Sequence, residues 1–156
     1  MQKKCDLYFH DYVNSSRLKL IALFDGNFKH VDGQKYIGFL QINVIRIKLI
    51  SVISDLRKNN LYCFSVPIEY RDCKNISFEV ALELANTYAA RCGATVSTSM
   101  HRSDKCPPLI WIFDLIGINN TEEQKAGGVI MVDRIDGHEW STSEYEEYLY
   151  DYNNVF

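Results

Sequence analysis

Residues 140–152 read Trp-Ser-Thr-Ser-Glu-Tyr-Glu-Glu-Tyr-Leu-Tyr-Asp-Tyr, and this stretch carries the clearest structural signal in the chain. Ser141 and Glu144 have the spacing of a capping box, in which the serine side chain accepts from the Glu144 amide and the glutamate bonds back to the serine amide. Trp140 and Tyr145 have the spacing of a hydrophobic staple around the same helix start. The stretch therefore predicts a helix near the end of the chain.

The side chains of this helix divide between two faces. One arc is apolar and aromatic and is expected to face the core; it holds Tyr145, Tyr148, Leu149 and Tyr152. The neighbouring arc is acidic, with Glu144, Glu147 and Asp151 at i, i+3 and i+7, and with Glu146 and Tyr150 towards the back. This acidic arc has two interpretations. It is either an ordinary solvated face or a surface that steers and contacts a basic partner.

Charge is distributed unevenly along the 156 residues, whose net charge is −3. Residues 133–156 contain seven acidic side chains and one arginine, which gives −6, so residues 1–132 carry +3 by difference. A negative total disfavours nonspecific binding to nucleic acid. An acidic surface on the final helix favours a basic protein partner instead.

The other signals predict a single α+β domain over residues 1–156, because no Pro/Gly/Ser-rich linker interrupts the chain. Apolar runs predict strands at 5–13, 17–24, 61–66, 94–100, 109–116 and 128–135. Helices are expected over most of 40–58, between a Ser77 cap and a Gly93 stop, and from 141 onward. We therefore expect a mixed or mainly antiparallel sheet of about 5–6 strands packed by two or three helices. Residues 36–50 stay ambiguous, because their β-branched content favours a strand over 37–47.

The chemistry-bearing side chains do not have the spacing of a known catalytic or metal motif. The 4 histidines form no H-x-x-x-H pair and the 5 cysteines form no C-x-x-C pair. Cys63 and Cys92 lie in apolar runs and are expected in the core. Cys106 precedes two prolines in a polar turn, which favours a structural role over a nucleophile paired with His101. We expect no catalytic residue, no metal and no cofactor.

The apolar stretch over 36–53 does not predict a membrane span, because polar and charged side chains interrupt it, among them Gln41, Asn43, Arg46 and Lys48. The first residues lack the apolar core of a secretory signal. Together with the odd number of cysteines, these features predict a cytoplasmic protein without a membrane partner.

The segment from Gly127 to Phe156, GGVIMVDRIDGHEWSTSEYEEYLYDYNNVF, resembles the C-termini of small bacterial immunity proteins. Such proteins neutralise the toxins of contact-dependent growth inhibition and related polymorphic toxin systems. The resemblance implies a non-enzymatic inhibitor that binds a basic toxin, expected to be a nuclease, and occludes its active site or substrate groove. The implied contact residues are Glu144, Glu147, Asp151, Tyr150 and Glu146, with Asp136 and Glu139 at the rim.

Two other classes of function stay open. A small acidic secretion or assembly chaperone, or another protein-binding module, would expose apolar surface and would be expected to dimerise. A small enzyme would have to assemble its site from scattered residues such as His101, Cys106 and Asp133. Loss of turnover in a Cys106→Ala variant would support that last class.

Overall fold

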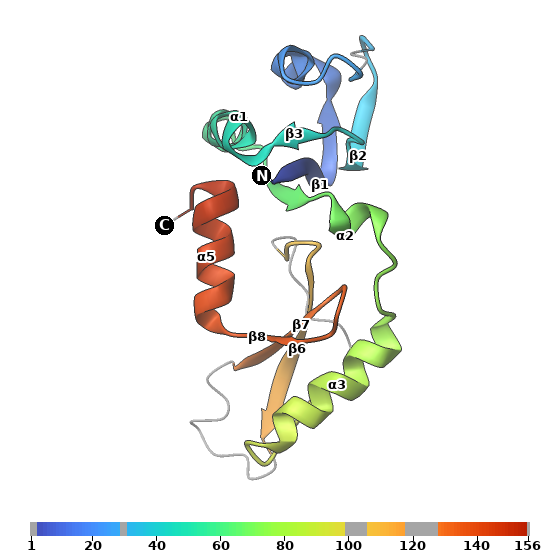
Figure 1. The fold of residues 1–156 in the computed structure, drawn as a ribbon, viewed down its shortest axis with the longest axis vertical. Helices are drawn as coiled ribbons and strands as arrows, with labels where there is room; N and C mark the ends of the chain where they lie inside the picture. Colours follow the sequence, from blue (N-terminus) through green and yellow to red (C-terminus); the bar gives the residue numbers. More distant parts are fainter. Residues whose placement is uncertain (1–2, 29–30, 99–105, 118–127, 156) are drawn as a thin grey trace. The chain divides into compact units, whose positions relative to one another are not determined.

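The computed structural model describes residues 3–28, 31–98, 106–117 and 128–155. It confirms the α+β class: the described strands form two antiparallel sheets of four strands each, accompanied by helices (Figure 1). The chain falls into two compact units, one of residues 1–72 and 145–156 (unit 1) and one of residues 73–144 (unit 2). One domain over 1–156 stays a prediction.

Unit 1 is built around β1 (Lys4–Asn14), which pairs antiparallel with β2 (Lys35–Phe39), β3 (Val44–Ile45) and β4 (Cys63–Pro67). From Cys5 to Phe9 every second residue of β1 is apolar and buried, as in a strand with one face on the core. Leu7 and Phe9 belong to this buried set. The strands expected at 5–13 and 61–66 are therefore confirmed.

Residues 15–23 form two short 3-10 helices, η1 (Ser15–Arg17) and η2 (Lys19–Leu23), so the strand expected over 17–24 is wrong. Leu18 and Ile21 are buried, three residues apart, whereas Leu20 and Leu23 are exposed. A strand would bury alternate residues instead. The run is apolar at nearly every position, so its composition alone does not separate the two periods.

Residues 36–50, which the sequence leaves ambiguous, divide between two strands and the start of a helix. β2 and β3 lie within or beside 37–47, and α1 (Arg46–Lys58) begins at Arg46. The helix expected over most of 40–58 is therefore confirmed, and it ends at Lys58. Its buried face is the one that the pattern predicts, with Leu49, Val52, Ile53 and Leu56. The short α2 (Glu69–Asp72) was not expected.

Unit 2 places α3 (Phe78–Ala90) against a sheet in the order β5-β6-β7-β8 (Figure 1). The strands are β5 (Ala94–Val96), β6 (Ile110–Gly117), β7 (Val129–Asp133) and β8 (Glu139–Trp140), and all neighbours are antiparallel. The Ser77 cap is confirmed, because its Oγ accepts from the Val80 amide at 3.2 Å. Gly93 follows the helix with φ +68°, as predicted.

The most deeply buried positions of α3 are all alanines. Ala81, Ala85 and Ala89 are fully buried against unit 2's core, and their small side chains let the helix approach the sheet closely. Cys92 lies beyond the last helical residue and is exposed, so the prediction that places it in the core is wrong. Cys63 is buried as predicted, and burial raises the pKa of its thiol to about 12.

The last helix, α5 (Thr142–Asn153), is confirmed together with its start, since Ser141 Oγ accepts from the Glu144 amide at 3.1 Å. Tyr148 is buried, and Tyr145, Leu149 and Tyr152 are half-buried, so the predicted inner arc is correct. Among the described residues, no helix combines the length and the apolar character needed to cross a bilayer. The polar composition of 117–127 predicts a loop, which lies outside the described residues except for Gly117, the last residue of β6.

Candidate functional site

The seven residues predicted to contact a partner fall in both units. Glu146, Glu147, Tyr150 and Asp151 lie on the part of α5 that belongs to unit 1. The other three, Asp136, Glu139 and Glu144, belong to unit 2. The two groups differ in how their side chains are engaged.

The inner side of α5 is anchored within unit 1 by buried hydrogen bonds to one strand residue. The Tyr148 hydroxyl donates to the Ser65 carbonyl at 2.6 Å, and the Asn153 Oδ1 accepts from the Ser65 amide at 2.8 Å. Arg46 adds a third attachment, because its guanidinium donates to the Asp151 carbonyl and lies 5.6 Å from the centre of the Tyr152 ring. These contacts determine which side of α5 faces solvent.

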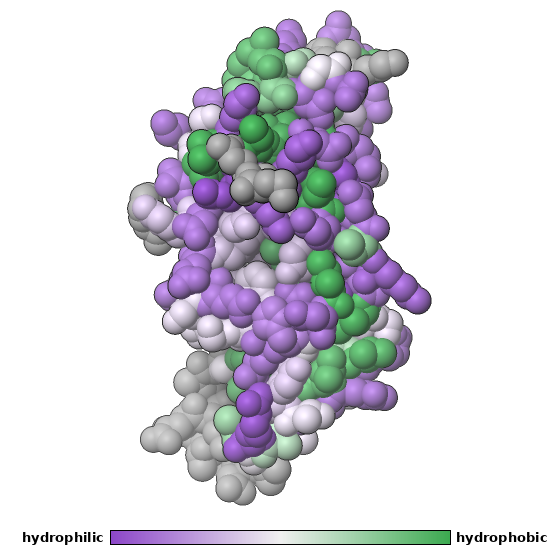
Figure 2. All heavy atoms as spheres, in the orientation of Figure 1, coloured by the Kyte–Doolittle hydropathy of each residue, from purple (hydrophilic) through white to green (hydrophobic). Residues whose placement is uncertain are grey.

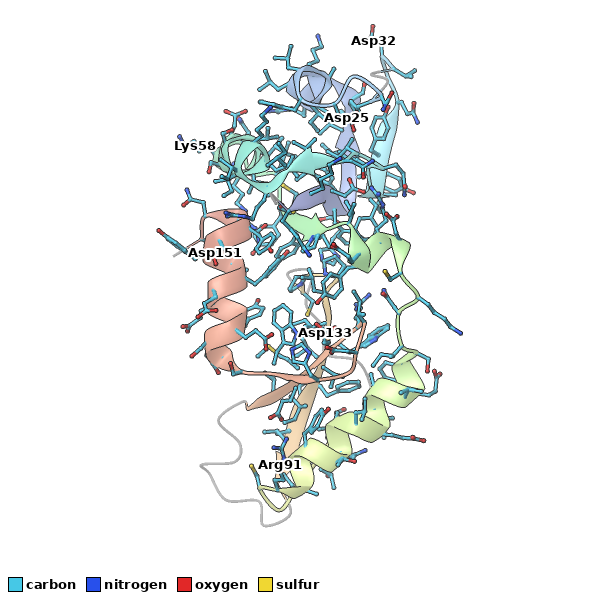
Figure 3. All side chains as sticks on the ribbon, in the orientation of Figure 1. Asp25, Asp32, Lys58, Arg91, Asp133 and Asp151 are labelled. Carbon is cyan, nitrogen blue, oxygen red and sulfur yellow. The ribbon has the colours of Figure 1, made fainter. Side chains whose placement is uncertain are left out.

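The opposite side of α5, which we call the α5 outer face, consists of Glu146, Glu147, Tyr150 and Asp151. All four residues are exposed, and Tyr150 retains 54% of its accessible surface. Figure 3 shows Asp151 on this helix. Across the described ranges, none of the three carboxylates has a lysine, arginine or histidine nitrogen within 4.0 Å. The outer face therefore presents three carboxylates beside an aromatic ring.

The three acids of unit 2 instead bond to basic side chains of the same unit. His138 lies between two of its acids: Nδ1 is 2.5 Å from Asp136 Oδ1 and Nε2 is 2.9 Å from Glu144 Oε2. The Asp136 carboxylate also accepts from the His138 amide at 2.9 Å. Glu139 forms an ion pair with Arg91 at 3.2 Å. The Glu144 carboxylate, which the capping box predicts at the Ser141 amide, reaches the His138 ring.

These contacts change the proton affinity of two groups. Partial burial lowers the pKa of His138, but the hydrogen bonds and charges of Glu144 and Asp136 outweigh it, so the pKa is raised above its ordinary value. The backbone hydrogen bond from His138, together with its ring, lowers the pKa of Asp136. These contacts therefore favour the protonated, imidazolium form of His138 between the carboxylates of Asp136 and Glu144.

Asp133 lies at the end of β7, within unit 2 (Figure 3), and only 2% of it is exposed. Its Oδ1 accepts from the amides of Ile135 at 2.8 Å and Asp136 at 3.2 Å, and its Oδ2 accepts from the Trp140 indole at 2.8 Å. A carboxylate with three such donors shapes the turn between β7 and β8.

One triad in this turn has the spacing of metal ligands, since ligand atoms of Asp133, Asp136 and His138 lie within 4.8 Å of one another. Each of these atoms already has a hydrogen-bonding partner in the turn. We therefore describe the triad as a hydrogen-bonded turn and assign no metal to it. The enzyme alternative also needs His101, which lies outside the described residues, so it stays untested.

A groove of about 890 Å³ lies in unit 1 between α1 and the end of α5. The Asn154 side chain donates to Ser54 Oγ at 3.5 Å beside it. Its lining mixes one acid with two bases, Asp55 with Arg57 and Lys58, and this mixture selects no single class of ligand.

His138 belongs to no histidine motif, so the sequence does not predict its two carboxylate contacts. The spacing Asp136-x-His138, directly before a helix that begins with an acid in its first turn, is the signal that could have found them. No family model, curated protein or solved structure matches this chain.

Proposed function

We propose that this chain is an immunity-type inhibitor that binds and neutralises a cognate bacterial protein toxin with a basic surface, such as a nuclease domain. The observation that supports the proposal best is the α5 outer face. In the part of the chain that the structure describes, these carboxylates have no lysine, arginine or histidine nitrogen within 4.0 Å, so no such ion pair has to break before they meet the basic side chains of a partner. Tyr150 adds a rigid amphipathic contact of the kind enriched in protein interfaces.

The mechanism that follows is occlusion by binding. Glu146, Glu147 and Asp151 would occupy the basic groove in which the toxin holds its substrate phosphates, and no chemical step is required. The proposal includes a cytoplasmic location, because a toxin that acts on intracellular nucleic acid has to be met there. Affinity is expected to fall as salt rises, since exposed charges are screened over about 8 Å at physiological ionic strength.

The test compares two matched pairs of exposed acids, each four residues apart on a helix. Glu147→Lys with Asp151→Lys reverses the α5 outer face, and Glu79→Lys with Glu83→Lys reverses an equivalent pair on α3. The proposal predicts a toxin domain encoded beside this chain; that domain is the probe, with complex formation measured by calorimetry and protection by cell survival. We expect the double variant on α5 to abolish complex formation and protection, and the double variant on α3 to leave complex formation and protection unchanged. Equal loss in both variants, or in neither, would refute the site.

One observation favours a different binding role. Leu23 is 78% exposed, and Leu20 and Phe24 beside it are also exposed, which gives η2 an apolar outer side (Figure 2). Contiguous exposed apolar side chains are typical of protein-binding surfaces, including those of chaperones. Light scattering separates this alternative: a chaperone is expected to be dimeric, with the dimer lost in Leu23→Asp. A monomer would count against it.

A further inference from the structure

The geometry around His138 defines the protonation state that it needs. A neutral imidazole has one N–H donor and one acceptor nitrogen, whereas an imidazolium has two donors. Both ring nitrogens of His138 face carboxylate oxygens, Asp136 at 2.5 Å and Glu144 at 2.9 Å. A neutral ring would hold a lone pair against one of these carboxylates. Only the doubly protonated ring satisfies both contacts.

The two contacts join different elements. Asp136 belongs to the turn between β7 and β8, and Glu144 lies in the first turn of α5, where its amide is held by Ser141. We propose that His138 is a pH-sensitive clamp, which fastens the start of α5 to the β7–β8 turn when it is doubly protonated and releases it as the pH rises. This device is independent of the proposed inhibitory function.

The charged groups around the ring support a proton on His138. On β7, Asp133 Oδ2 lies 4.0 Å from Nδ1, so three carboxylates face the ring. The ring also stacks on Trp140, 6.3 Å between centres and 16° between planes. From α3, the Tyr88 hydroxyl donates to the Gly137 carbonyl at 2.6 Å.

On α3, Arg91 forms an ion pair with Glu139 of β8 at 3.2 Å. Its charge is therefore engaged by a carboxylate that is not one of the three facing the ring.

The direction of the pH effect follows from the raised pKa of His138. A group whose pKa is higher in the folded state than in the unfolded chain stabilises the fold below its unfolded pKa, about 6.5, and loses this contribution as the pH passes the folded pKa. Breaking the two contacts costs the acids little free energy, because the side chains of Asp136 and Glu144 are 63% and 40% exposed and can be hydrated. We therefore expect loosening at the start of α5 rather than unfolding.

The first experiment measures the titration of His138 in the whole chain by nitrogen-15 NMR in buffer containing EDTA. We expect a pKa above 6.5, with both ring nitrogens protonated below it, and a decrease of about 0.5–1 in the pKa of the Glu144→Gln variant. A pKa at or below 6.5 in the unaltered chain, or no change in the variant, would overturn the proposal.

The second experiment follows urea unfolding from pH 5.5 to 9. His138→Gln keeps a donor and a similar shape but cannot become charged. Its midpoint is expected to lie below that of the unaltered chain at pH 6 and to converge with it at pH 9. Thr95→Ala, at an exposed position of β5 that has no titratable side chain, is the control, and its offset should not change with pH. A His138→Gln offset that is also constant with pH would show that no clamp exists.

Discussion

Arg71 Nη1 lies 3.0 Å from Asp6 Oδ2, and this ion pair closes a buried polar network in unit 1. Asp6 is fully buried and also accepts from the amides of Leu7, Gln41 and Ile42. Arg71, whose side chain is 10% exposed, donates in addition to the Ile42 carbonyl at 2.8 Å. Two residues 65 positions apart thus connect β1, the segment before β3, and α2.

Replacing Arg71 with methionine is expected to destabilise the chain by about 3 kcal/mol at pH 7, because it leaves a buried carboxylate without its counter-ion. Burial already raises the pKa of Asp6, against the hydrogen bond from Arg71. Without Arg71 that pKa rises further, so the loss should shrink as the pH falls towards 5 and Asp6 takes up a proton. Urea unfolding at both values measures this.

Lys3→Met is the control for that variant. It removes an ion pair with Glu69 whose side chains are about half exposed, and exposed pairs contribute at most about 1 kcal/mol. If both variants cost the same, the buried network would not have the importance that its geometry indicates.

Tyr148→Phe is expected to cost about 1–2 kcal/mol, because it leaves the buried Ser65 carbonyl without the donor that it has at 2.6 Å. The ring remains, so packing changes little. Tyr12→Phe, on a residue that is 68% exposed, should change the free energy of unfolding by less than about 0.5 kcal/mol. The same urea series compares them, and a cost for Tyr148→Phe no larger than for Tyr12→Phe would contradict the anchor.

Gly137→Ala separates crowding from backbone strain. Gly137 has φ +76°, and an added Cβ would lie 2.6 Å from a Leu84 methyl carbon. Gly33 has φ +80°, but an added Cβ there would meet nothing within 4 Å. Both alanines incur the left-handed strain of about 1–2 kcal/mol, and only Gly137→Ala adds a collision. Thermal unfolding should place it clearly below Gly33→Ala; equal melting temperatures would show that Leu84 moves aside.

Asp133→Ala is expected to destabilise by about 2–4 kcal/mol, since two backbone amides and the Trp140 indole lose their acceptor together. EDTA should leave the melting temperature of the unaltered chain unchanged if the turn is held by these hydrogen bonds alone. A decrease on adding EDTA would show instead that Asp133, Asp136 and His138 hold a metal ion.

Local signals predicted the three long helices α1, α3 and α5, but not α2, the two 3-10 helices or most of the tertiary hydrogen bonds. The Ser77 and Ser141 caps act within four residues, so their motifs are visible in the sequence. The strand wrongly expected over 17–24 shows the limit, because a continuous apolar run fits more than one periodicity. Which of its residues are buried depends on the sheet that the run covers.

For the candidate site, the sequence likewise predicts which helix positions are exposed but not which side chains bond to one another. The exposure of Glu147 and Asp151 follows from the helical period and is confirmed. The engagement of Glu144 by His138 depends on how a turn folds back onto a helix start, and hydrophobic periodicity does not encode that. The Asp6–Arg71 pair depends on tertiary structure over 65 residues, for which the sequence contains no local signal.

The attachment of α5 to Ser65 also has a consequence for the order of events during synthesis. The N-terminal 72 residues emerge from the ribosome before their partners Tyr148 and Asn153 exist. At about 5–20 residues per second, the intervening stretch delays those partners by roughly 4–15 seconds. During that interval the Ser65 backbone groups lack their side-chain partners. Unit 1 is therefore expected to stay incomplete until residues 145–156 have been synthesised.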